Sequence, residues 1–66
     1  MTHPNEAAVL QFASINAEAE AIGYAVLASD FEEARFRAHL VASLAEDLGL
    51  SPIVDAARDV ELRLGR

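Results

Sequence analysis

The sequence predicts a single all-α domain made of three helices joined by two short turns. Apolar residues recur at spacings of three and four, and no stretch alternates between apolar and polar residues for long enough to form a strand. Residues that start and end helices divide the 66 residues into three segments. We expect helices over residues 4–28, 30–48 and 52–64, packed as an antiparallel up-down three-helix bundle.

The first expected helix begins at Pro4, a residue favoured in a first helical turn, with Thr2 or His3 as its cap. It carries two apolar strips on roughly opposite sides. The first strip is Phe12, Ile15, Ala19, Ile22 and Val26, and the second is Leu10, Ala13, Ala17, Tyr24 and Leu27. Two interpretations stay open: this helix is wedged between the other two, or its second strip binds another chain.

The second expected helix follows Ser29, and Glu32 stands three residues later in the pattern of a capping box. Gly49 is expected to end this helix in the left-handed conformation, followed by the apolar Leu50. One narrow apolar strip, widened at one position, is expected to form the core. Its members are Phe31, Ala34, Ala38, Val41, Leu44, Ala45 and Leu48.

The third expected helix is capped by Ser51, with Pro52 in its first position, where a missing N–H group costs nothing. It is expected to end near residue 64, before Gly65. Its core face is expected to be Ile53, Ala57, Val60 and Leu64.

Composition and charge exclude several classes of function. The net charge is −6 and there is no lysine, which disfavours both nucleic acid and membrane surfaces as ligands. Cysteine is absent, and His3 and His39 are too far apart in sequence to form a ligand cluster, so we expect no metal and no cofactor. No transmembrane span or signal peptide is expected, which predicts a cytoplasmic protein.

The predicted core is thin, since fourteen of the apolar residues are alanine. Domains of this size rarely gain more than about 3–5 kcal/mol from one core. Without disulfides or a metal, association is the remaining source of stability. We therefore expect a homodimer that completes the bundle through the second strip of the first helix, formed by Leu10, Ala13, Ala17, Tyr24 and Leu27.

His39 is the candidate for a chemically reactive side chain. At about 100° per residue it projects away from the apolar strip of its helix, and a neutral imidazole is a competent nucleophile. The segment 29–39, which ends in Ala-His, resembles the approach to the active histidine of histidine-phosphotransfer (HPt) domains. Leu48-Gly49 matches the family's Leu-Gly helix stop, Ile53 matches an apolar anchor, and Val60-Glu61 matches its Leu-Glu.

The resemblance implies an HPt-like hairpin in which His39 carries a phosphoryl group to or from a receiver domain or histidine kinase. The sequence departs from the family at Ala42, where a lysine is usual, and at Ser43, where a glycine is usual. HPt domains also usually close a four-helix bundle. Arg35, one turn before the histidine, is a possible replacement for the missing cation, because an arginine can pair two phosphate oxygens.

Two hypotheses therefore stay open. The first is a small phosphorelay protein with His39 as phosphoacceptor and Arg35 as the stabilising cation. The second is a non-catalytic helical adaptor or homodimeric module that binds a signalling partner without phosphotransfer. In either case the partner is expected to bind Phe36, Leu40, Ala42 and Ser43.

Activity as an independent enzyme is not favoured, because the sequence has no catalytic triad, glycine-rich phosphate loop or paired-carboxylate cleft. Glu18 and Glu20 are two residues apart and do not share a helix face, so we interpret them as a solvated edge.

Overall fold

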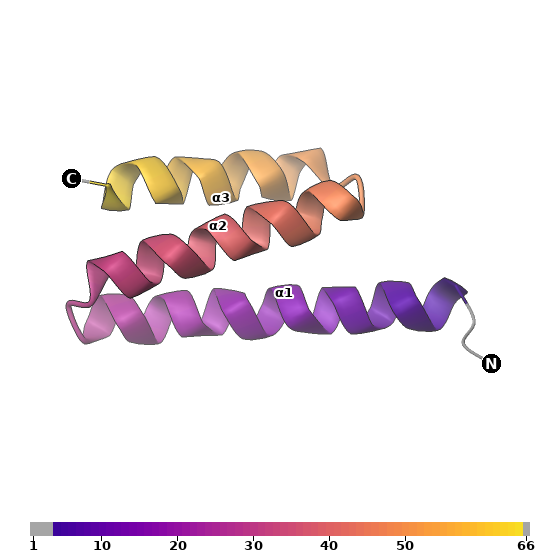
Figure 1. Cartoon of the computed structure of the whole chain (residues 1–66), viewed down its shortest axis with the longest axis horizontal. Coiled ribbons are helices and arrows are strands. Elements are labelled where there is room, and N and C mark those ends of the chain that lie inside the picture. The colour runs from indigo at the N-terminus through magenta and orange to yellow at the C-terminus, as the bar shows by residue number, and fades with distance from the viewer. Residues whose placement is uncertain (1–3, 66) are drawn as a thin grey trace.

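A computed structural model describes residues 4–65, which form three helices and no strand. These are α1 (Pro4–Leu27), α2 (Phe31–Asp47) and α3 (Ser51–Leu64). Consecutive helices fold back on one another through the two turns (Figure 1). The prediction of an all-helical chain with three helices is confirmed, and each described boundary falls within one residue of its expected position. The predicted cap at Thr2 or His3 lies outside the described residues.

The three helices form one layer rather than a closed bundle. Within residues 4–65, α1 and α3 each pack against α2 and do not contact each other. The chain measures 43 × 21 × 12 Å, so its shortest dimension is about that of one helix with its side chains. The interpretation that the first helix is wedged between the others is wrong. Short turns make consecutive helices neighbours, so the second helix in the chain occupies the middle.

The first turn is a Schellman motif centred on Ser29, which has a positive φ of 58°. The Ser29 amide donates to the Val26 carbonyl (2.9 Å) and the Asp30 amide donates to the Ala25 carbonyl (2.8 Å). Asp30, and not Ser29, caps α2: its carboxylate accepts from the Glu33 amide at 3.2 Å. The predicted capping box at Ser29 is therefore wrong, because that residue supplies the left-handed turn that ends α1.

The second turn repeats this motif with a glycine. Gly49 has φ 71°, and the Leu50 amide donates to the Ala45 carbonyl at 2.9 Å, which confirms the predicted end of α2. The predicted cap at Ser51 is wrong. The Leu50 carbonyl already accepts the first hydrogen bonds of α3, so Leu50 is the N-cap residue, and no side chain caps this helix.

The core is built on small side chains. Ile15 of α1, Val41 of α2 and Ala57 of α3 are buried, and leucine, isoleucine and valine side chains pack around them while remaining partly exposed. Phe31, predicted to lie in the core, is about half exposed because it begins α2 beside the first turn. The positions with no exposed surface are four alanines of α2: Ala34, Ala38, Ala42 and Ala45.

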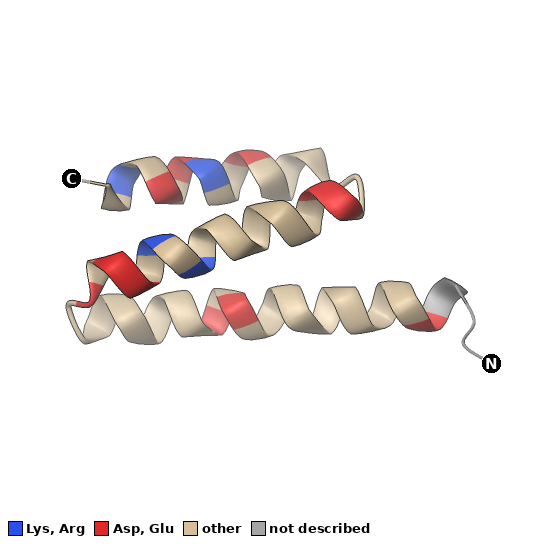
Figure 2. Cartoon of the chain, viewed as in Figure 1, with Lys and Arg blue, Asp and Glu red and all other residues tan. Residues whose placement is uncertain are grey.

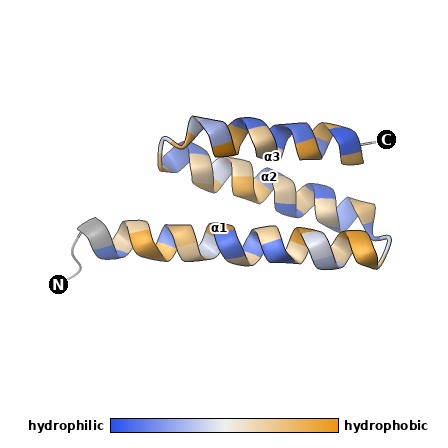
Figure 3. Ribbon diagram, turned by 180° about the vertical axis from the view of Figure 1, so that it is seen from behind, coloured by the Kyte–Doolittle hydropathy of each residue, from blue (hydrophilic) through white to orange (hydrophobic). Residues whose placement is uncertain are grey.

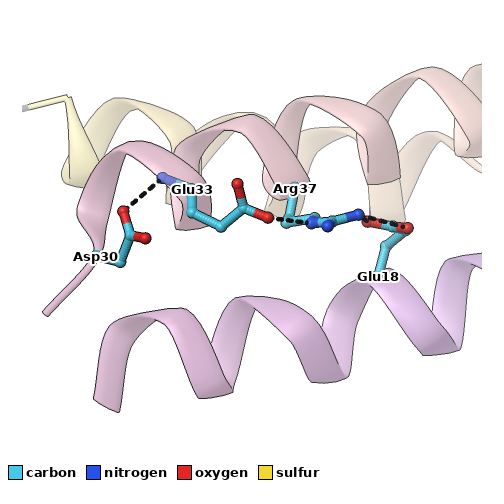
Figure 4. A network of polar contacts seen from close by, with 4 residues as sticks. All are labelled: Glu18, Asp30, Glu33 and Arg37. Atoms are coloured by element: carbon cyan, nitrogen blue, oxygen red, sulfur yellow. Dashed lines mark hydrogen bonds and ion pairs between the residues drawn. The ribbon is translucent and has the colours of Figure 1, made fainter. Parts of the chain in front are cut away.

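One polar network links α1 to α2 (Figure 4). The Arg37 guanidinium donates to Glu33 at 2.7 Å and to both oxygens of Glu18, at 2.9 and 3.1 Å. The hydrogen bonds to Glu18 and then Glu33 raise the pKa of Arg37 further above its ordinary value, so this residue stays charged. Glu18 is therefore half-buried and paired, which corrects its interpretation as a solvated edge; Glu20 is exposed.

Candidate functional site: the His39 edge and the outer face of α1

His39 lies on the edge of α2 that faces α3. Its side chain is 56% exposed, and its Nδ1 atom is 3.5 Å from Oε1 of Glu61 on α3. That carboxylate oxygen is buried and accepts no hydrogen bond from any described residue. A carboxylate beside Nδ1 favours the imidazole tautomer that carries its proton on Nδ1. The lone pair is then on Nε2, on the other side of the ring.

A shallow groove of about 430 Å³ lies next to this pair, between α2 and the last turns of α3. The Nη1 atom of Arg35 donates to the Leu64 carbonyl at 3.5 Å, at the end of α3 where backbone carbonyls lack helical partners. On the same side of α2, Glu46 pairs with Arg58 of α3 at 3.1 Å. The groove is lined by Arg35, Arg58, Glu61, Leu62 and Gly65.

The four residues expected to bind a partner do not share one surface. Phe36 and Ser43 are exposed and Leu40 is half-buried, and their spacing places these three on one face of α2. Ala42 has no exposed surface. The prediction that Ala42 belongs to a partner-binding patch is therefore wrong, because the residue faces the core between the neighbouring helices.

The outer face of α1 carries exposed apolar side chains along the helix. All five residues of its second strip are exposed, and Leu10, Tyr24 and Leu27 are exposed by 65%, 69% and 84%. Of the first strip, Ile15 and Ile22 pack into the core, whereas Phe12, Ala19 and Val26 are exposed. Acidic residues are the only charges on α1, whereas all the arginines lie on α2 and α3 or beyond (Figure 2). Hydrophobic positions recur along the coloured part of α1 (Figure 3).

Sequence reasoning missed Glu61 as a partner of His39. In the sequence, Glu61 stands out only through the Val-Glu match to the HPt pattern. The position of the turn between the two helices predicts this contact. Two helices that reverse at Gly49 and Leu50 bring together residues whose numbers sum to about 100, and 39 and 61 are such a pair.

Comparison of the chain with protein-family models, with curated proteins and with solved structures finds no match. Within the described residues, no group of three or more acidic or histidine side chains is placed to hold a metal ion. None of the helices in residues 4–65 combines the length and apolar character needed to cross a membrane.

Proposed function

We propose that the protein is a small helical interaction module that pairs with a second copy of itself through the outer face of α1. The pairing leaves the His39 edge of the α2–α3 hairpin free for a signalling partner, for which a receiver domain or a histidine kinase is the candidate class. The main support for this proposal is the exposure of Leu10, Tyr24 and Leu27 on a helix face that no other part of residues 4–65 covers.

The size of this face supports a second copy as its occupant. Fully burying a large aliphatic side chain removes roughly 100 Å² of apolar surface from water. Val9 is exposed like Leu10, Tyr24 and Leu27, so the four together offer about 400 Å². Two such faces, with the alanines and polar residues beside them, approach the lower end of the about 1,200–2,000 Å² that stable interfaces bury.

The architecture supports the same conclusion. Stable domains pack two or more layers around a core, whereas residues 4–65 form one layer in which only alanines are fully buried. Dimerisation of such a chain adds stability through mass action.

The proposal predicts a dimer that dissociates on dilution and is weakened at least tenfold by Leu27→Gln. Two-fold symmetry uses the leucine twice, so each dimer loses two apolar contacts. Light scattering across a dilution series measures the molar mass. The matched control is Leu62→Gln on α3, a leucine that is 76% exposed and lies outside the face. A monomer at micromolar concentration, or equal weakening by both variants, would contradict the proposal.

A second candidate function is a phosphorelay carrier with His39 as phosphoacceptor, favoured by the placement of Glu61. In this reaction the Nε2 lone pair attacks the phosphorus of an aspartyl phosphate on a receiver. The acyl phosphate P–O bond breaks and the aspartate carboxylate leaves. Nδ1 keeps its proton, and the carboxylate beside it offsets the positive charge of the phosphorylated ring. Arg35 lines the adjacent groove and is the nearest candidate cation on the same strip of α2.

The burial of Ala42 weighs against this second candidate, because the cation that assists phosphoryl transfer in the HPt pattern has no place on the surface at that position.

Carrier activity predicts acid-labile phosphate on the protein after incubation with phosphorylated receiver domains. The label should be absent in His39→Gln and reduced in Glu61→Gln. The control is Glu32→Gln, a surface carboxylate on α2 that the structure does not place beside the histidine. If a receiver binds the protein and no label appears, the carrier hypothesis fails and the interaction module remains.

A further inference from the structure

Residues on the outer face of α1 recur at a regular spacing, although this face packs against no other helix of the single chain. Its positions are separated alternately by three and four residues, which is the heptad spacing of helices that pack side by side. All six positions are exposed in the single chain. They are Leu10, Ala13, Ala17, Glu20, Tyr24 and Leu27.

We infer that two copies pair through this face in antiparallel orientation, with residue i of one copy opposite residue 37 − i of the other; this rests on the proposed function. In that register Leu10 faces the partner's Leu27, so large apolar side chains meet at both ends. Tyr24 faces the partner's Ala13, so the large ring is opposite a methyl group. Near the centre, Ala17 faces the partner's Glu20. The small alanine leaves room for the glutamate side chain to extend into water.

The parallel, in-register alternative is less complementary. It would set each residue opposite its own copy, so two Tyr24 rings would compete for one layer while the paired alanines at positions 13 and 17 would leave gaps in two other layers. Only the antiparallel register sets Ala13 opposite Tyr24 and Ala17 opposite Glu20, so steric fit specifies that pair.

The apolar character of the face favours a second copy as its occupant. Five of its six heptad positions are apolar, and two such faces approach the lower end of the area that stable interfaces bury. The one charged position is Glu20, which the antiparallel register sets opposite an alanine.

Single-cysteine variants test the register, since the chain has no cysteine of its own. Leu10→Cys and Leu27→Cys are mixed in equal amounts, equilibrated and linked with a short bis-maleimide, and the products are weighed by mass spectrometry. Residues 10 and 27 are about 25 Å apart along one helix, so neither variant alone should form a linked dimer. We expect the yield of the linked mixed dimer to exceed that of either linked homodimer at least tenfold. Random collision would give only a twofold excess.

Leu62→Cys mixed with Leu10→Cys measures the background of random encounters. A second pair, Ala13→Cys with Tyr24→Cys, gives the same readout nearer the centre of the helix and serves if the first pair weakens the dimer. Linked homodimers of Leu10→Cys alone would establish the parallel arrangement and overturn the inference.

Random products from variants that still scatter as dimers would also overturn the register while leaving the proposed dimer intact. Stronger dissociation by Phe12→Gln than by Leu27→Gln would then place the interface on the first strip. A monomer throughout the dilution series would remove both the register and the proposed function.

Discussion

The substitution Ala42→Lys is expected to unfold the protein at room temperature. The alanine has no exposed surface and lies in the cluster formed with Ile15, Val41 and Ala57. A lysine there overfills the core, at a cost of about 1–3 kcal/mol, and also takes an ammonium group out of water. The whole domain is expected to be stable by only about 3–5 kcal/mol, so these costs exceed what it can lose. Far-UV circular dichroism, at fixed protein concentration, measures the loss of helix.

The neighbouring substitution Ser43→Lys is the matched control. It adds the same side chain one residue later, at an exposed position, and should leave the melting temperature nearly unchanged. The pair also tests the family resemblance, because a lysine in place of Ala42 would restore the residue usual in HPt domains. A variant that keeps its helicity and melts like the parent would mean that α2 is rotated to expose position 42, and phosphotransfer would regain support.

The substitution Ile15→Ala is expected to have the second largest effect, a loss of about 2–5 kcal/mol. Ile15 is the largest side chain that is buried on α1, and it joins α1 to the cluster under α2 and α3. The other α1 side chains at this contact are small or only partly buried, Ala25 and Ile22 among them, so little surrounding core can collapse to fill the cavity. Urea denaturation followed by circular dichroism, at one protein concentration throughout, should show an unfolding midpoint near zero denaturant.

Leu62→Ala removes a similar aliphatic group from a side chain that is 76% exposed, and it should change the unfolding free energy by less than about 0.5 kcal/mol. Equal effects of the two substitutions would show that α1 does not depend on the buried cluster. The layered arrangement of the three helices would then be incorrect.

Most of the secondary structure could be predicted because its determinants are local. Pro4 and Pro52 mark helix starts, and Gly49 takes the left-handed backbone conformation without strain because it has no Cβ atom. The first turn shows the limit of that reasoning. Ser29 and Asp30 are both good capping residues, and the choice between them depends on which one must adopt the positive φ that reverses the chain.

The candidate site was predicted only in part. The exposure of His39 follows from helical periodicity. Periodicity also defined the second strip of α1 but left open whether other helices cover it, and the structure leaves it exposed. Glu61 was missed as the partner of His39, and Ala42 was assigned to the wrong surface. Both errors have one cause: periodicity defines the faces of a helix but not which neighbour lies against each face.

The sequence by itself determined the number of helices, their limits, the small-residue core and the two apolar strips of α1, because these depend on contacts within a few residues along the chain. Only the tertiary structure decided that α2 lies in the middle, that Ala42 is buried and that Glu61 approaches His39. Those facts depend on how the helices rotate against one another. That rotation is set by the packing of residues distant in sequence, which no local pattern specifies.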